Sequence, residues 1–84
     1  MPDTVHTVTA PLMGIFYRAA APGQPPLAEV GQQVAEGDVV CVLESMKIFT
    51  ELRAGRAGTV TAILVENEDP VMKNQPLIEI ASTG

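Results

Sequence analysis

The amino-acid sequence predicts an all-β domain built from two related halves. Short segments rich in β-branched and apolar residues alternate with Gly, Pro, Asn and Asp, which is the pattern of strands and turns. A weak internal repeat relates the first half of the chain to the second. With two Phe, one Tyr and no Trp, the core must be filled by Val, Ile, Leu and Ala. We expect residues 1–84 to form one small domain, with its core over about residues 5–81.

The repeat appears when two segments of the chain are aligned. Gly31–Leu43 falls on Glu68–Ile80 at an offset of 37 residues, whereas Gly14 falls on Gly58 at an offset of 44. The two offsets differ, so the first half should contain an insertion of about seven residues that the second half lacks.

The insertion can be placed at about residues 19–26. Ala19–Pro26 is the one stretch of the first half that is rich in small residues, Pro and Gly. Its prolines exclude a central strand, and its glycine favours a turn. The composition of this segment would fit any surface loop. Its presence in only one half of the repeat is what identifies it as the insertion.

Four strands are expected in the first half, in chain order. Val5–Thr9 and Gly14–Tyr17 carry β-branched and aromatic residues around the Pro11 turn region. Leu27–Val30 follows the proline-rich insertion and ends at Gly31. Val39–Glu44 begins after Gly37 and contains the β-branched residues Val39, Val40 and Val42.

Three more strands are expected in the second half. Ile48–Arg53 ends before Gly55, and Gly58–Val65 runs to the polar segment that contains Asp69-Pro70. Leu77–Ala81 closes the domain.

A single helix over Val39–Leu52 is the strongest competing prediction. Leu43, Met46, Phe49 and Leu52 recur every three residues, as on one face of a helix. Five β-branched residues in the same stretch favour strands instead. The repeat also aligns the start of this stretch with a terminal segment that is too short for a helix. Two strands joined as a hairpin are therefore preferred.

The predicted hairpin has a turn of unusual composition. Met46 and Lys47 occupy the two turn positions, where Asn-Gly or Asp-Gly would form most readily. No Gly or Pro occurs between Gly37 and Gly55. A local choice that opposes local conformational preference is most often a functional site, and here the amine of Lys47 would be displayed.

Composition argues against several classes of function. The net charge is −5, without a basic stripe or interleaved aromatic residues, so a nucleic-acid partner is not expected. Phosphate-binding loops and metal-ligand clusters are missing, and His6 is the only histidine, which gives little support to a zinc site or a His-based triad. Neither an enzyme nor a metal site is expected.

The expected compartment is the cytoplasm or one like it. No apolar run approaches the length of a membrane span, and the first residues do not resemble a signal peptide, so no membrane association is expected. Cys41 is the only cysteine and lies in an apolar run, which indicates a buried, inert thiol in a reducing compartment.

The segment Glu44–Ile48, with the sequence Glu-Ser-Met-Lys-Ile, resembles the biotin-attachment motif of biotin carboxyl carrier domains, which is commonly Glu-Ala-Met-Lys-Met. The resemblance extends over about residues 5–81. The flanking segments that share it are Pro11–Arg18, Val30–Val34, Gly37-Asp38 and Ala57–Val60.

The resemblance implies a fold and a function. The fold would be a flattened β-barrel or sandwich of two quasi-symmetric four-stranded halves, with the modified lysine on an exposed hairpin. Ala19–Pro26 would be the thumb of carriers from bacterial and plastid acetyl-CoA carboxylase, which extends the expected location to the plastid stroma. Lys47 would be biotinylated and would carry CO2, as carboxybiotin, from biotin carboxylase to carboxyltransferase in fatty acid biosynthesis. The domain would be a non-catalytic carrier of a multi-subunit carboxylase.

The resemblance also assigns roles to neighbouring residues. Glu44 and Met46 would be read by biotin protein ligase, although Glu44 could equally be a solvated strand residue and Met46 a core residue. Lys73 lacks the flanking pattern and is expected to be a plain surface lysine. The residues of the thumb that would contact biotin are Ala19, Ala20, Ala21 and Pro22.

Departures from the family pattern leave alternatives open. Ser45 and Ile48 replace the usual Ala and Met, and the thumb lacks the side-chain hydroxyls of Thr-Pro-Ser-Pro, so a side-chain clamp on biotin is in doubt. A carrier of another biotin-dependent carboxylase is the nearest alternative. A lipoyl carrier, whose hairpin usually has Asp-Lys-Ala, and an interaction module with an unmodified Lys47 are further ones.

Overall fold

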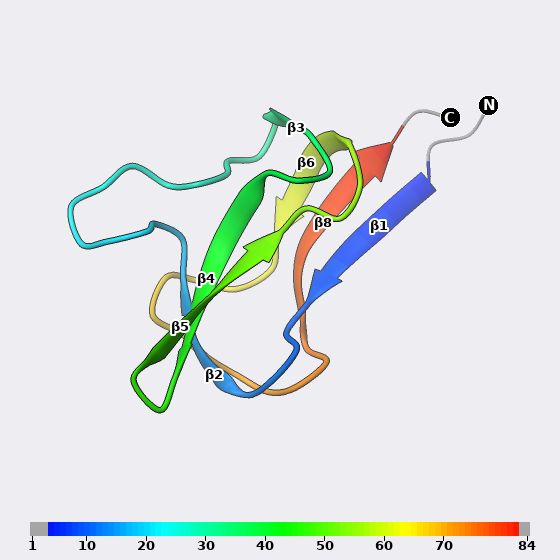
Figure 1. The fold of residues 1–84 in the computed structure, drawn as a ribbon. Helices are drawn as coiled ribbons and strands as arrows, with labels where there is room; N and C mark the ends of the chain where they lie inside the picture. Colours follow the sequence, from blue (N-terminus) through cyan, green and yellow to red (C-terminus); the bar gives the residue numbers. More distant parts are fainter. Residues whose placement is uncertain (1–3, 83–84) are drawn as a thin grey trace.

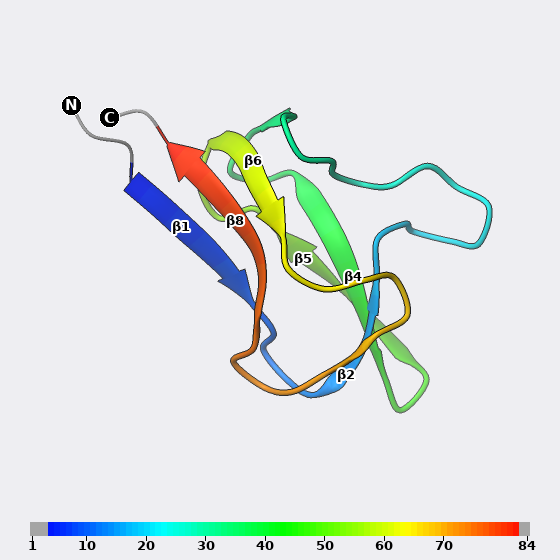
Figure 2. The same ribbon diagram turned by 180° about the vertical axis from the view of Figure 1, so that it is seen from behind.

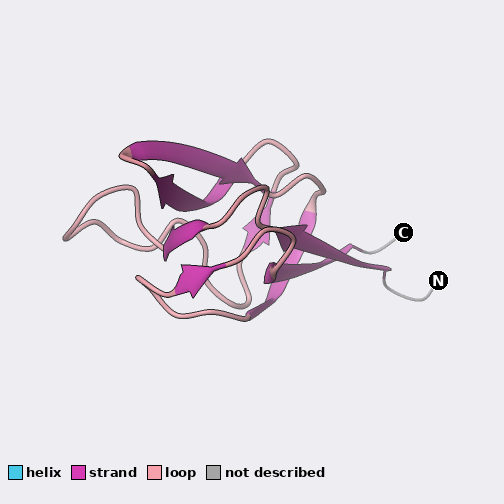
Figure 3. Ribbon diagram, turned by 90° about the horizontal axis from the view of Figure 1, so that it is seen from below, coloured by secondary structure: helices cyan, strands magenta, loops and turns pink. Residues whose placement is uncertain are grey.

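The computed structural model describes residues 4–82, which form eight β-strands and no helix. Figure 3 accordingly shows only strands and loops in this part of the chain. The all-β prediction is confirmed, and the competing helix over Val39–Leu52 is wrong. The strands are β1 (Thr4–Thr9), β2 (Gly14–Tyr17), β3 (Gln33–Val34), β4 (Val39–Ser45), β5 (Ile48–Arg53), β6 (Gly58–Ile63), β7 (Pro70–Val71) and β8 (Pro76–Ser82).

The strands form two antiparallel four-stranded sheets, in the orders β1-β8-β6-β3 and β5-β4-β2-β7 (Figure 1). Each sheet takes two strands from each half of the sequence, so the two halves interleave. Their inner faces enclose one core, in which Phe16, Leu43 and Ile80 are almost completely buried. Burying each such side chain contributes about 1.5–3 kcal/mol, which is how a chain with few aromatic residues holds a stable fold.

The internal repeat is a structural two-fold relation. The predicted offset of 37 residues carries β4 onto β8 residue for residue, and the offset of 44 carries β1 onto β5. The same offsets relate Gly14 to Gly58. A Cβ on Gly14 would collide with the carbonyl oxygen of Glu44, and one on Gly58 with that of Ala81, which lies 37 residues after Glu44. Close backbone contact therefore explains both glycines.

Two turns of the first half recur in the second. In each, the backbone N–H of the first residue donates to the side chain of the fourth, which closes the turn without help from the sheets. The donor–acceptor pairs are Glu29 with Gln32 (3.1 Å) and Glu66 with Asp69 (3.0 Å), then Ala35 with Asp38 (2.9 Å) and Met72 with Gln75 (2.9 Å). Each pair of turns again differs by 37 residues.

The prediction of a strand over Leu27–Val30 is wrong. These residues lie in the loop between β2 and β3, and the strand of this region is the two-residue β3 that follows. Gly31 has a φ of 94° within the turn that starts at Glu29, which breaks the extended chain before a strand can form. β6 ends at Ile63, two residues before the predicted end, and β1, β4 and β8 each extend by one residue at one or both ends. β7 was not predicted, because only two residues pair.

The loop between β2 and β3 protrudes from the molecule, as Figures 1 and 2 show. Its base is closed by a hydrogen bond from the Leu27 N–H to the Arg18 carbonyl (2.7 Å). The Arg18 N–H donates in turn to Asn67 Oδ1 (2.8 Å), and Arg18 Nη2 to the Ala28 carbonyl (3.2 Å). The predicted insertion at about residues 19–26 forms the protruding part, so we call residues 19–26 the thumb.

Candidate functional site: the β4–β5 hairpin

Met46 and Lys47 form the two-residue turn between β4 and β5. Their φ angles are 53° and 66°, and Ser45 pairs with Ile48 on either side of them. Both turn residues are therefore left-handed, as in a type I′ turn, where Asn and Gly are preferred. For residues with a Cβ this conformation costs roughly 1–2 kcal/mol each. The sequence thus accepts an unfavourable turn in order to hold Met46 and Lys47 there.

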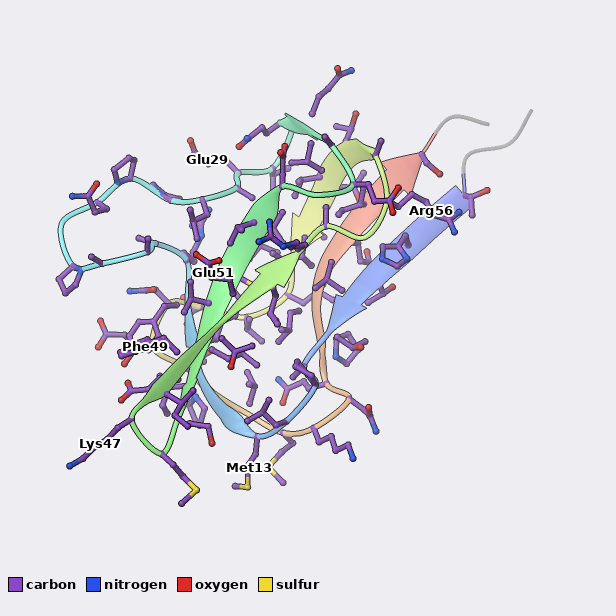
Figure 4. All side chains as sticks on the ribbon, viewed as in Figure 1. Met13, Glu29, Lys47, Phe49, Glu51 and Arg56 are labelled. Carbon is purple, nitrogen blue, oxygen red and sulfur yellow. The ribbon has the colours of Figure 1, made fainter. Side chains whose placement is uncertain are left out.

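The turn places its side chains in solvent. Met46 is 91% exposed and Ile48 is 66% exposed, and Lys47 is exposed as well. Within residues 4–82, Lys47 makes no ion pair and no side-chain hydrogen bond, since the single ion pair joins Arg53 to Glu51. Figure 4 shows Lys47 projecting away from the tip of the hairpin. An amine in this setting is accessible to an enzyme that acylates it.

Glu44, three residues before Lys47, is held in place by Tyr17. The Tyr17 hydroxyl donates a hydrogen bond of 3.0 Å to Glu44 Oε1 between neighbouring strands β2 and β4. This hydrogen bond, followed by desolvation and the negative charges of Glu44 and Glu68, raises the pKa of Tyr17 above its usual 10.0. Glu44 is half-buried, so it is more than a free solvated carboxylate.

Tyr17 was not singled out from the sequence. Its ring also packs near Phe49 of β5, with 6.3 Å between ring centroids and an angle of 48° between planes. Tyr17 on β2, Glu44 on β4 and Phe49 on β5 are therefore neighbours across three adjacent strands of one sheet. No linear spacing in the chain indicates this grouping, because it depends on the register of β2 against β4.

A pocket of about 540 Å³ lies between the thumb and this sheet. Tyr17, Val42 and Phe49 form its sheet side, and Asn67 and Glu68 of the β6–β7 turn close one edge. The predicted thumb residues all line it, namely Ala19, Ala20, Ala21 and Pro22. The lining is largely apolar. The thumb has no side-chain hydroxyl, so its backbone groups and the side-chain amide of Gln24 are the polar atoms that it can offer to a ligand.

The one histidine and the one cysteine of the chain both lie away from the hairpin turn. His6 lies on β1 of the other sheet, paired with Ile80. Across residues 4–82, no group of three or more His, Cys, Asp or Glu side chains could hold a metal ion, and no helix is long and apolar enough to span a membrane. Cys41 is buried in β4, and desolvation raises its pKa to about 12, so its thiol is inert. At the hairpin turn, the exposed amine of Lys47 is a group to which another molecule could be attached.

Comparison with known proteins agrees with this geometry. Residues 6–80 match the Biotin_lipoyl family, described as "Biotin-requiring enzyme". The biotin carboxyl carrier protein of acetyl-CoA carboxylase from Nostoc sp. is 47% identical over 73 residues, which are 87% of this chain and 40% of that protein. Its counterpart from Pseudomonas aeruginosa is 45% identical over 75 residues, 89% of this chain and 48% of that one. The chain thus spans less than half the length of these two relatives.

Two solved structures share the fold. Urea carboxylase from Kluyveromyces lactis superimposes with a TM-score of 0.76 and 29% identity, over 95% of this chain and 6% of that one. A single-chain, multi-domain long-chain acyl-CoA carboxylase gives a TM-score of 0.78 and 25% identity, over 95% and 7%. The resemblance drawn from the attachment motif is confirmed: the chain belongs to the biotin-requiring, biotin/lipoyl attachment family.

Proposed function

We propose that this domain is a biotin carboxyl carrier of acetyl-CoA carboxylase, with biotin attached through an amide to Lys47. The observation that carries the proposal is the left-handed Met46-Lys47 turn, which presents an exposed amine. The names of the relatives from Nostoc and Pseudomonas support the assignment to acetyl-CoA carboxylase. The domain itself, residues 1–84, would be a non-catalytic carrier acting in fatty acid biosynthesis, in the cytoplasm or plastid stroma.

The residues present fit an attached biotin. Lys47 supplies the nucleophile, because an exposed amine can lose its proton and attack an acyl adenylate brought by biotin protein ligase, with AMP as leaving group. When bound, biotin supplies a ureido nitrogen that accepts and releases CO2. The lysine and biotin chains together have roughly ten bonds that advance ~1.3 Å each, which gives a reach of ~13 Å. The tether raises the concentration of biotin at an enzyme on which the domain docks.

Neighbouring residues receive supporting roles. Met46 is proposed as a contact read by the ligase, since it is the most exposed large apolar residue among those described. Glu44 is proposed as a second recognition residue, oriented by Tyr17. The thumb residues Ala19–Pro22 are proposed to meet the biotin ring through apolar contact and backbone groups, because they line the pocket beside Phe49.

The proposed partners are biotin protein ligase, biotin carboxylase and carboxyltransferase. A carrier for another biotin-dependent carboxylase is the second candidate, favoured by the structural likeness to the urea and long-chain acyl-CoA carboxylases. Carboxylation assays with acetyl-CoA, other acyl-CoA thioesters and urea, each with its matching carboxylase, would separate the candidates.

The intact mass of the domain co-expressed with a biotin ligase tests the proposal. We expect one biotinyl increment on the wild type and none on Lys47→Arg, whose guanidinium stays protonated and is a poor nucleophile. Lys73→Arg is the matched control and should be modified like the wild type. A lipoyl increment, an unmodified wild type, or a modified Lys47→Arg would each contradict the proposal.

The thumb can be tested in the same system. Replacing residues 20–25 by two glycines shortens the loop above its base and should leave folding and biotin attachment intact, since loop length changes closure entropy only weakly. Carboxyl transfer should fall. Transfer at the wild-type rate would remove the thumb from the proposal.

A further inference from the structure

Three methionines are exposed on the structure, although Met is one of the residue types most often buried. Met46, Met13 and Met72 are 91%, 60% and 63% exposed. They come from three distant parts of the sequence, and they are all the methionines among residues 4–82.

The three methionines each lie just beyond the paired residues of neighbouring strands, so extending the strand register brings their positions side by side. Ile15 of β2 faces Glu44 of β4, so continuing by two residues sets Met13 opposite Met46. Gly14 faces Val71 of β7, so continuing by one residue sets Met13 opposite Met72. We call Met46, Met13 and Met72 the methionine row. Adjacent strands are ~4.8 Å apart, so the row extends ~10 Å from the turn that contains Lys47.

The row lies at the end of the molecule that bears Lys47. Figure 4 shows Met13 at this end, close to the hairpin tip, with Arg56 far away near the other end. A flexible, polarizable thioether suits a surface that must fit a partner protein, and methionines are over-used at such surfaces.

The charged side chains in the segments that form this end are all positive. The segments that form it are Pro11–Gly14, Ser45–Ile48 and Met72–Gln75. They contain Lys47 and Lys73 and no carboxylate, whereas the whole chain has a net charge of −5. The complementary surface is apolar at its centre and acidic at its rim.

A typical protein interface is wide enough to include both Lys47 and the methionine row. A partner of standard size covers ~800 Å² on each protein, which corresponds to a circle of radius ~16 Å. A partner whose active site receives Lys47 and that has this footprint covers Met13 and Met72. The lysine side chain alone reaches ~6 Å, so an enzyme acting on the free amine must touch the hairpin itself.

We propose that the methionine row, flanked by Lys73, is the docking surface for the ligase that acylates Lys47. The partner face would be apolar with an acidic rim. This inference rests on the proposed function, because it requires Lys47 to be the acceptor. After acylation, the longer arm allows later enzymes to bind with less contact at the row, so the dependence on Met13 and Met72 belongs chiefly to the ligase.

Steady-state kinetics of purified biotin ligase, with the unmodified domain as variable substrate, test the inference. The variant Met13→Gln/Met72→Gln keeps side-chain length and removes apolar surface. We expect KM for the domain to rise about tenfold and kcat to change less than about twofold, since contacts away from the reacting amine contribute to binding. The matched control is Val30→Gln/Leu64→Gln, two residues that are 63% and 47% exposed and lie outside the three segments.

A charge reversal tests the acidic rim. Lys73→Glu should lower kcat/KM about tenfold at low salt, and less at high salt, because surface charges steer association and are screened. Arg56→Glu, an exposed charge reversal at the far end, should have little effect. Circular dichroism and melting temperature should be unchanged in all four variants.

The outcomes separate this inference from the proposed function. Absence of biotin on the wild type would refute the proposed function. A biotinylated wild type with an unchanged KM in the double methionine variant would overturn the docking surface alone. So would a loss confined to carboxyl transfer, which would assign the row to a carboxylase component.

Discussion

At the scale of single residues, the decisive feature is a backbone conformation. Met46 and Lys47 both adopt positive φ, which neither side chain favours. Asn74, at the turn related to Gly37 by the repeat, also has positive φ, but Asn tolerates that conformation well. The hairpin turn is thus more strained than the same turn would be with Asn or Gly at these two positions. The proposed attachment of biotin at Lys47 would account for this choice of residues.

Met46→Asn should relieve this strain. Asn is preferred at the first position of a type I′ turn, and the exposed Met46 side chain has few contacts to lose, so the free energy of unfolding should rise by about 0.5–1 kcal/mol. Thermal or urea denaturation measures this change. If Met46 is a ligase contact, biotin attachment should become slower in the same variant.

Ser45→Asn provides the control, because that residue lies within β4 and gains nothing from a left-handed preference. Lower stability of Met46→Asn would show that Met46 packs against the sheet. Unchanged attachment would remove Met46 from ligase recognition.

At the scale of elements, the two-fold relation makes paired positions equivalent. Gly14 and Gly58 each approach the backbone of a neighbouring strand, at sites related by the repeat. Gly37 is different, because a Cβ there meets no atom within 4 Å. Alanine at these three positions therefore distinguishes close packing from chain flexibility.

Gly14→Ala and Gly58→Ala should each lower the free energy of unfolding by about 1–3 kcal/mol, because a backbone oxygen must move to admit the methyl group. Gly37→Ala should be neutral or slightly stabilising, since alanine lowers the entropy of the unfolded chain. Urea denaturation of the three variants measures the effect. Equal stability of all three would show that the close approaches at Gly14 and Gly58 are relaxed without cost.

The elements also show what the sequence could predict. The repeat located β4, β8, Gly14 and Gly58, because these follow fixed offsets along the chain. The sequence pointed to Lys47 because the two turn residues oppose local conformational preference, and the structure places both at positive φ. The contact of Tyr17 with Glu44 and the alignment of Met13 with Met72 were not found, because each depends on cross-strand register. β7 was missed because a two-residue strand beginning at Pro70 has no periodic pattern to detect.

At the scale of the whole molecule, the single thiol reports on cooperative unfolding. Cys41 is completely buried in the core between the sheets. Alkylation by iodoacetamide should be on the order of a thousandfold slower or more in the folded protein than in urea, since it requires unfolding. Mass spectrometry of the alkylated protein measures both rates, and rapid labelling of the native protein would show local opening of β4.

The contribution of the Cys41 thiol to the free energy of unfolding should decrease as the pH rises. Burial raises the pKa of Cys41 from 9.0 to about 12, so the folded state retains the proton that the unfolded state releases. The resulting contribution to stability is complete below pH 9 and is lost as pH rises toward 12. Cys41→Val lacks the thiol, so its stability should fall less over that range. Parallel pH profiles for the two proteins would contradict this cause.

The pairing of β1 with β8 has a mechanical consequence. Thr4 pairs with Ser82, and this pair of strand ends lies across the molecule from the hairpin tip (Figures 1 and 2). A polypeptide fused at either strand end would therefore be attached on the side of the domain opposite Lys47. The domain is 42 Å long in its longest dimension, so rotation about that attachment point would move Lys47 over a much greater distance than its side chain spans. Rotation of the whole domain would therefore provide the long-range movement of Lys47, and the lysine side chain would provide only the final short adjustment.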